Sequence, residues 1–188
     1  EERAAIAAYI AQIEIEKANA FIRVFTIINQ NFKKFFAELS EGTANLILEK
    51  PESIFEGGVI IEAHPRGKKV KNLEAMSGGE KSLCALSFIF SMQQVDYQPF
   101  YVLDEVDAAL DPNNVDKLGN LISRLSLGVQ NKKAQFIVIS HREILMAKAN
   151  QVWGVTSDKG VSSLFRLNLD DYRKKMEAEA ETASPQVG

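Results

Sequence analysis

The sequence predicts an α/β fold in which a mostly parallel sheet is flanked by helices. Two short apolar runs, at residues 100–103 and 136–139, are typical of strands that are covered on both faces. Between them a helical pattern begins at Asp111-Pro112 and continues to about Leu125, and proline suits the first position of a helix. A strand, a helix and a strand in this order favour a parallel pair, with ligands bound beyond the carboxyl ends of the strands.

The bulk composition indicates one soluble globular domain. The chain has 188 residues, of which 46% are hydrophobic and 25% are charged. The net charge of −3 means that any contact with DNA would have to come from a local basic patch. The single cysteine, Cys84, excludes an internal disulfide and favours a reducing, cytoplasmic compartment, where we expect it to be a small buried hydrophobe.

No apolar run reaches the length that a membrane span needs, and no signal peptide is visible, so no membrane partner is expected. The chain begins at Glu1 inside a helical pattern and without an initiating methionine. We therefore expect it to be a fragment of a longer protein.

Residues 1–39 read as one long helix. Its apolar positions follow the 3-4 spacing of a coiled-coil seam, and Lys17 interrupts them: Ile6, Ile10, Ile13, Ala20, Val24 and Ile27. From Phe21 onward the apolar stripe widens, as in a helix that packs into a globular core. We expect a coiled-coil stump over residues 1–20. The alternative is a plain amphipathic helix with both ends in the core.

Two strands are predicted at residues 45–49 and 58–63, and the second is apolar enough to be central in a sheet. A basic cluster follows on a loop, at Arg66, Lys68, Lys69 and Lys71. We interpret it as a solvated loop, with phosphate contact as the alternative. His64 lacks partners at metal-ligand spacing and is interpreted as incidental.

The stretch Met76-Ser77-Gly78-Gly79-Glu80-Lys81-Ser82 reads as a helix N-terminus prepared for an anion. Ser77 can cap the helix, and Glu80 can close a capping box. Gly78 and Gly79 leave backbone N–H groups open to a phosphate. The alternative is an ordinary capped helix. The helix, residues 78–93, is apolar nearly all round and should be buried.

Chemistry-bearing side chains follow both predicted strands. Asp104 and Glu105 come after the first, where one carboxylate could hold Mg²⁺ and the other could orient a water. Ser140 and His141 follow the second. The alternatives are a strand that happens to end in acids and a core histidine. Asp111 suits a helix N-cap.

The C-terminal part is predicted to hold a helix at residues 143–150 and a hairpin of residues 152–156 and 161–167, which turns at residues 158–160. Trp153 is expected in the core. From about Asp170 the chain turns helical and charged, and its end is expected to be disordered.

Three motifs resemble those of the ATPase head of the structural maintenance of chromosomes (SMC) family, which are ATP-binding-cassette (ABC) proteins. The sequence Ser77-Gly78-Gly79-Glu80 matches the signature motif, and residues 103–111, LDEVDAALD, match the Walker B motif and D-loop. Ser140-His141-Arg142 matches the switch. The similarity spans about residues 20–169 and implies the C-terminal lobe of an ABC-type head over residues 21–169, followed by a helix and tail over residues 170–188.

The resemblance implies ATP and Mg²⁺ as cofactors, with Asp104 as the metal contact and Glu105 and His141 as catalytic residues. It further implies that the nucleotide of a second head contacts Ser77, Gly78, Gly79, Glu80 and Asp111. The histidine at position 141 favours a bacterial or archaeal member. The implied partners are a second SMC head, a kleisin subunit and DNA, in a nucleoid-associated protein of chromosome condensation and segregation.

The chain contains no Gly-x-x-x-x-Gly-Lys-Ser/Thr sequence, which is the P-loop that cradles nucleotide phosphates. In the family that loop lies in the N-terminal half of the head, so that half is a further expected partner. The isolated chain is accordingly predicted to be inactive as an ATPase.

Other functions remain open at the level of sequence. They are a DNA double-strand-break repair ATPase of the same superfamily, a transporter nucleotide-binding domain, and a kleisin-binding platform without catalysis. The long helical entry speaks against the transporter.

Overall fold

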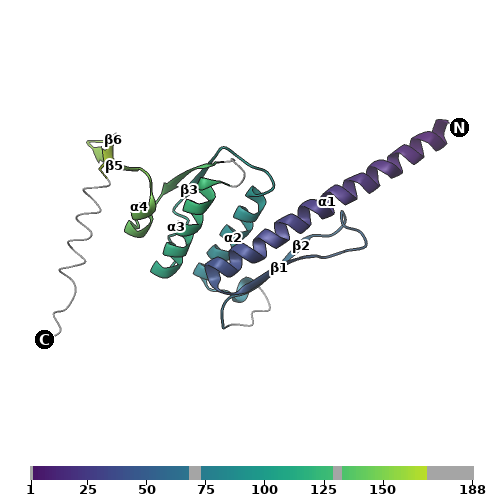
Figure 1. Ribbon diagram of the computed structural model, residues 1–188, viewed down its shortest axis with the longest axis horizontal. Coiled ribbons are helices and arrows are strands. Elements are labelled where there is room, and N and C mark those ends of the chain that lie inside the picture. The colour runs from purple at the N-terminus through teal and green to yellow at the C-terminus, as the bar shows by residue number, and fades with distance from the viewer. Residues whose placement is uncertain (1, 68–72, 129–132, 169–188) are drawn as a thin grey trace.

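The computed structural model describes residues 2–67, 73–128 and 133–168 (Figure 1). The helices and strands follow the sequence prediction closely, with ends that differ by at most two residues. Their order is α1 (Glu2–Ser40), β1 (Thr43–Leu48), β2 (Val59–His64), the 3-10 helix η1 (Leu73–Ala75), α2 (Gly78–Gln93), β3 (Phe100–Asp104), α3 (Pro112–Leu127), β4 (Gln135–Ile139), α4 (Glu143–Lys148), β5 (Val152–Asp158) and β6 (Val161–Leu167).

The predicted N-terminal helix is confirmed as a single element of 39 residues, roughly 58 Å long at 1.5 Å per residue. Figure 1 shows its first half projecting away from the rest of the molecule. The seam residues Ile6, Ile10 and Ile13 are exposed there, so they are free to meet another helix. Pairing in a coiled coil remains a prediction. Lys17, which interrupts the seam, places its Nζ 4.0 Å from the centre of the Phe55 ring.

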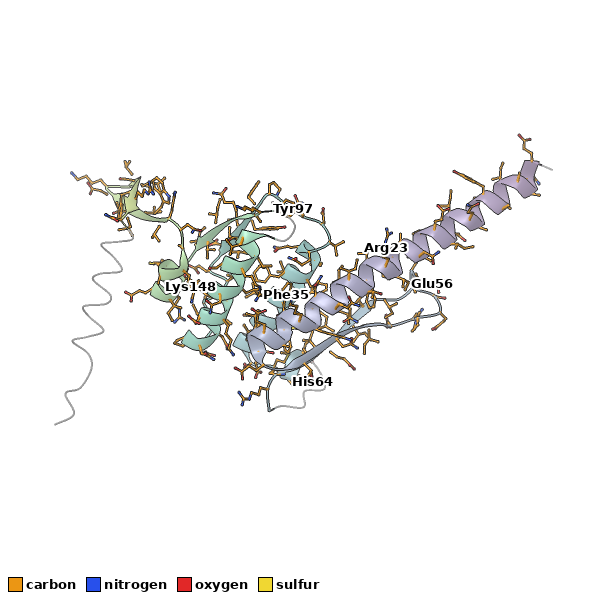
Figure 2. The ribbon with its side chains drawn as sticks, viewed as in Figure 1. Arg23, Phe35, Glu56, His64, Tyr97 and Lys148 are labelled. Carbon is orange, nitrogen blue, oxygen red and sulfur yellow. The ribbon has the colours of Figure 1, made fainter. Side chains whose placement is uncertain are left out.

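The C-terminal end of α1 lies between two hydrophobic clusters. Phe32 and Phe36 pack with the β1–β2 hairpin, while Phe35 and Leu39 pack with α2 and α3. Phe35 is labelled in Figure 2. Two neighbouring stripes of the same helix therefore face two different clusters, which explains the wide apolar stripe in the sequence. The larger cluster also includes Leu83, Leu86, Phe90, Leu103, Leu110, Val115, Leu118, Leu121, Ile122 and Leu145.

The prediction of a mostly parallel sheet is wrong for the described part of the chain. The strands form three separate pairs, and only β3 and β4 are parallel. The pairs β1–β2 and β5–β6 are antiparallel. The physical reason is that a strand–helix–strand unit yields one parallel pair, and extending it requires strands that these residues do not supply.

Several apolar segments expected to be buried are exposed on one side. One face of β3–β4 packs on the core, but Phe100, Val102, Ile137 and Ile139 on the other face are exposed. The predicted central strand β2 pairs only with β1 among the described residues, and its Val59 and Ile60 are exposed. Hydrophobicity in the sequence marks a surface that needs a partner, and the described residues of this chain do not cover these faces.

The same correction applies to two further expectations. The helix α2 is not buried all round, because Ile89 and Met92 are exposed. Trp153, expected in the core, is 56% exposed on β5.

The turn of the β5–β6 hairpin is confirmed. Lys159 and Gly160 both have positive φ, as a two-residue turn of this kind requires. The expected helix and tail from residue 170 and the basic positions 68, 69 and 71 lie outside the described residues. Within the described parts of the chain, no helix has the length and apolar character needed to cross a bilayer.

Candidate functional site

The N-terminus of α2 has the predicted capping box. Ser77 Oγ accepts a hydrogen bond from the Glu80 backbone N–H at 3.4 Å, and Glu80 Oε2 accepts one from the Ser77 N–H at 2.8 Å. The cap fixes the start of the helix at Gly78, and the first N–H groups of a helix have no partner within it. Binding of an anion at this helix end remains a prediction.

The two glycines of this motif have different surroundings. A methyl group placed on Gly78 would meet no atom within 4 Å, so its face of the helix end is open. A methyl group on Gly79 would lie 2.8 Å from the carbonyl oxygen of Ala109. Both were predicted to clear space for a phosphate. Gly78 fits that role, whereas Gly79 allows the segment after β3 to approach the helix.

Glu105 directly follows β3 and has a left-handed backbone, with φ of 47°. Its N–H donates to the carbonyl oxygen of Ile139 at 3.0 Å, which continues the parallel ladder one residue beyond β3. Its own carbonyl accepts from the Ala108 N–H at 3.0 Å and starts a tight turn. A non-glycine residue in this conformation costs about 1–2 kcal/mol, so the surroundings hold it there.

The structure brings the two predicted catalytic residues together. His141 Nε2 lies 3.5 Å from Glu105 Oε1, and both side chains are exposed. They come from the ends of the neighbouring strands β4 and β3, as the sequence predicted. A carboxylate and an imidazole this close can share the handling of a proton on a bound water.

Asp104 is the last residue of β3 and is exposed. Among the described residues, no group of three histidine, cysteine or acidic side chains could hold a metal. A single carboxylate nevertheless fits Mg²⁺, because this ion is usually bound by one or two carboxylates together with water and substrate phosphates.

Asp111 is the N-cap of α3, as predicted. Its Oδ1 accepts from the Asn114 N–H at 3.0 Å, and its Oδ2 accepts from the Asn114 side-chain amide at 2.6 Å. Pro112 occupies the beginning of the helix. The side chain is exposed, so the cap leaves it accessible.

The sequence analysis missed Asp107. This carboxylate is only 2% exposed, and its Oδ2 accepts a hydrogen bond from Ser140 Oγ at 2.6 Å. Asp107 lies within the LDEVDAALD run, but nothing in the local pattern distinguishes it from the exposed acids beside it. The signal is its pairing with Ser140, which only the fold brings close.

Comparison with known proteins identifies the family of the chain. The family described as the RecF/RecN/SMC N terminal domain matches residues 3–163. The chain belongs to this family. The "Chromosome partition protein Smc" of Pyrococcus furiosus is 48% identical over 94% of the chain, which spans only 15% of that relative.

Solved SMC heads have the same α/β fold. The head domain of Pyrococcus furiosus Smc, with an extended coiled coil and bound to the C-terminal domain of ScpA, is similar with a TM-score of 0.82 at 46% identity. That match covers 94% of this chain and 43% of that one. A second structure, from work on ATP-driven dimerization and DNA-stimulated activation of SMC ATPases, has a TM-score of 0.74 at 45% identity. There the match covers 89% of this chain and 98% of that one.

In this SMC head region, three other polar positions lie outside the site just described. Arg66 forms an ion pair with Glu41. The Nδ1 of His64 is buried and has no hydrogen-bond partner among the described residues. Burial raises the pKa of the Cys84 thiol to about 11, so this cysteine is the inert hydrophobe that was predicted.

Proposed function

We propose that the chain is the C-terminal half of an SMC ATPase head and works with an N-terminal half that carries the P-loop. The complete head engages a second head across ATP, in the service of chromosome condensation and segregation. One observation carries the proposal: His141 lies 3.5 Å from Glu105 at one strand edge, in a chain without a P-loop sequence. The chain has side chains that can orient a water and take its proton, whereas the loop that binds the nucleotide phosphates has to come from the N-terminal half.

The exposed face of β3–β4 supports the proposal that a second half of the head packs against it. Val102 and Ile137 are register partners on this face, and Phe100 and Ile139 are exposed on the same two strands. The chain also corresponds to only 43% of the solved Pyrococcus furiosus head. A cover for this face would complete both the core and the nucleotide site.

Each site residue has one role in this proposal. Bound Mg²⁺-ATP would supply the reacting phosphate and the charge of the metal. Asp104 offers one oxygen toward the metal, and Glu105 orients the attacking water and takes its proton. His141 donates a hydrogen bond toward the terminal phosphate. Ser77, Gly78, Glu80 and Asp111 face the nucleotide of the second head, and Gly79 belongs to the same motif but lets the Ala109 segment pack against the helix.

Partners are proposed from the relatives. Solved Smc heads were crystallised with the C-terminal domain of ScpA and with its C-terminal winged-helix domain, and another study concerns DNA-stimulated SMC ATPases. We expect this chain to contribute to binding a kleisin subunit and to respond to DNA in a cytoplasmic, nucleoid-associated complex. Residues 1–20 would enter a coiled coil, residues 21–169 form the lobe, and residues 170–188 form the tail.

The experiment is complementation. The P-loop-bearing half is added as a separate polypeptide, and ATP turnover is measured with and without DNA. Neither half alone should turn over ATP. In the reconstituted head, Glu105→Gln should retain ATP-dependent dimers and lose hydrolysis, because binding groups remain and the base is gone.

A matched variant separates engagement from chemistry. Ser77→Arg places bulk and positive charge at the helix end, so dimers should disappear from gel filtration with ATP, while each head keeps its fold. Brisk turnover by the isolated chain, or normal dimers with Ser77→Arg, would overturn the proposal. A head that binds a kleisin but never hydrolyses ATP would instead indicate the non-catalytic platform.

A further inference from the structure

We infer that Asp107 is a positioning residue: through its hydrogen bond with Ser140, it holds the His141 backbone in place opposite Glu105. The inference rests on the proposed function, since it assigns a task within the same site. It concerns a residue that does not face the exposed edge where the chemistry is proposed. The argument depends on burial and on three contacts between two segments.

The first observation is the burial of a carboxylate. Asp107 is 2% exposed, and its side chain forms no ion pair among the described residues. Burying a carboxylate is unfavourable unless hydrogen bonds compensate it. The short bond from Ser140 Oγ, at 2.6 Å, provides that compensation. A buried charged group contributes little to stability by itself, so a role in placing neighbouring residues accounts for it better.

The second observation is that Ser140 is held from both sides. Its hydroxyl donates to Asp107, and the same oxygen accepts the N–H of Arg142 at 2.9 Å. His141 is the residue between these two anchors. The path of the chain through His141 is therefore fixed, although its side chain is exposed.

The third observation is that the contact is one of three in a row. The Glu105 N–H donates to the Ile139 carbonyl at 3.0 Å, and Arg142 Nη2 donates to the Leu110 carbonyl at 3.3 Å. The bond between Asp107 and Ser140 lies between them in sequence and is the only one of the three formed by two side chains. Removing it leaves the segments attached at both ends but free in the middle, where His141 lies.

The consequence is a specific kinetic defect. Glu105 and His141 would still be present and nucleotide would still bind, but their 3.5 Å approach would no longer be maintained. Loss of this alignment between Glu105 and His141 should lower kcat roughly 10- to 100-fold. The KM for ATP and ATP-dependent head engagement should change less than about threefold, since no binding group is lost.

The test uses the reconstituted head with Ser140→Ala, and with Ser140→Thr as the conservative variant that keeps a hydroxyl. Ser87→Ala is the matched control, because Ser87 is fully buried and its hydroxyl donates to the Leu83 carbonyl at 2.7 Å, far along α2 from the helix end. Ser140→Ala should lose kcat, Ser140→Thr should recover most of it, and Ser87→Ala should match the parent. Asp107→Ala combined with Ser140→Ala should be no slower than either single variant, because both remove the same bond.

A second measurement does not need turnover. The chain has two histidines, so their imidazole NMR signals are easily assigned, and His64 serves as an internal reference. Glu105→Gln should shift the His141 signal in the parent chain and shift it much less when Ser140→Ala is also present. If the His141 response is the same with and without the Ser140 hydroxyl, or if Ser140→Ala keeps full kcat, the inference is wrong. Failure of the parent head to hydrolyse ATP would contradict the proposed function, and the NMR result would still decide the role of Asp107.

Discussion

Glu105, the proposed general base, has a backbone conformation that is unfavourable for residues other than glycine. Its φ of 47° lies in the left-handed region, while its N–H continues the ladder to Ile139. The gain of that ladder bond and of the following turn offsets the strain. Strain at a catalytic position is expected where placement matters more than stability.

This strain leads to a prediction about Glu105→Gly. Glycine removes a penalty of about 1–2 kcal/mol, and its extra freedom in the unfolded chain costs about 0.5–1 kcal/mol, so the fold should gain up to about 1.5 kcal/mol. Urea unfolding of the isolated chain measures the effect. Glu105→Ala is the control, because it removes the same carboxylate and keeps the strain. Equal stability of the two variants would show that the backbone is relaxed at this position.

The two glycines at the start of α2 give a second prediction at this scale. Gly79→Ala should destabilise the chain by about 1–3 kcal/mol, because the new methyl group would lie 2.8 Å from the Ala109 carbonyl and force the backbone apart. Gly78→Ala is the matched control and should leave stability nearly unchanged, since its surroundings are empty. Thermal unfolding of both variants checks the difference. Similar melting temperatures would mean that the helix end and the Ala109 segment are not in contact.

At the scale of elements, ion pairs join the end of α1 to α3. Arg124 of α3 binds Glu38 through two hydrogen bonds of 2.7 and 2.6 Å, and Lys117 of α3 binds Glu41 at 2.7 Å. The N-cap of α3 is Asp111, a residue of the candidate site, and Lys148 joins α4 to α3 (Figure 2), because its Nζ is 2.8 Å from Asp116. The long helix α1 is thus attached to α3, the helix whose N-terminus lies at the candidate site.

The pH dependence of the α1–α3 connection is predictable. Hydrogen bonds from Lys117, and then from Arg66, lower the pKa of Glu41 below its ordinary value of 4.5. A lowered pKa in the folded state stabilises the fold above pH 4.5, and the contribution is lost as the pH falls through the folded-state value. Glu41→Gln should therefore destabilise the chain more at pH 7 than at about pH 3.

Urea unfolding at the two pH values measures this effect, and added salt should weaken it because the groups are exposed. Glu52→Gln is the control, since Glu52 is exposed and forms no ion pair among the described residues. A loss of stability that is the same at both pH values would assign the effect to something other than the charge of Glu41.

At the scale of the whole molecule, much apolar surface remains uncovered. The outer face of β3–β4 and the first half of α1 are both apolar and exposed, and Figure 1 shows α1 reaching far from the body of the lobe. Large exposed apolar faces mark interaction surfaces. One face lies next to the site, whereas the other lies at the far end of a long helix.

We predict that these faces have different partners. Val102→Ser combined with Ile137→Ser should change the stability of the isolated chain by less than about 0.5 kcal/mol, because the residues are exposed. It should abolish binding of the P-loop-bearing half in calorimetric titration. Ile6→Ser combined with Ile10→Ser is the control and should leave that binding unchanged. Equal binding by all three chains would show that β3–β4 is not the surface for the missing half.

Local chemistry made most elements predictable from the sequence. The capping box of Ser77 and Glu80, the Asp111-Pro112 helix start and the turn at Lys159-Gly160 all depend on residues within four positions of one another. The pairing of Glu105 with His141 was also predictable in outline, because the ends of parallel neighbours share an edge. The burial of Trp153 and of β3 was predicted wrongly, because hydrophobicity does not show whether the covering surface belongs to the same chain.

The sequence by itself determined the helices, the strands and the identity of the groups at the strand ends, since these follow from short-range periodicity and capping. Only the tertiary structure decided that Asp107 is buried against Ser140, that Gly79 is packed against Ala109, and that Glu105 is strained. Each of these depends on a contact between segments about 30 residues apart, whose distance no local pattern encodes.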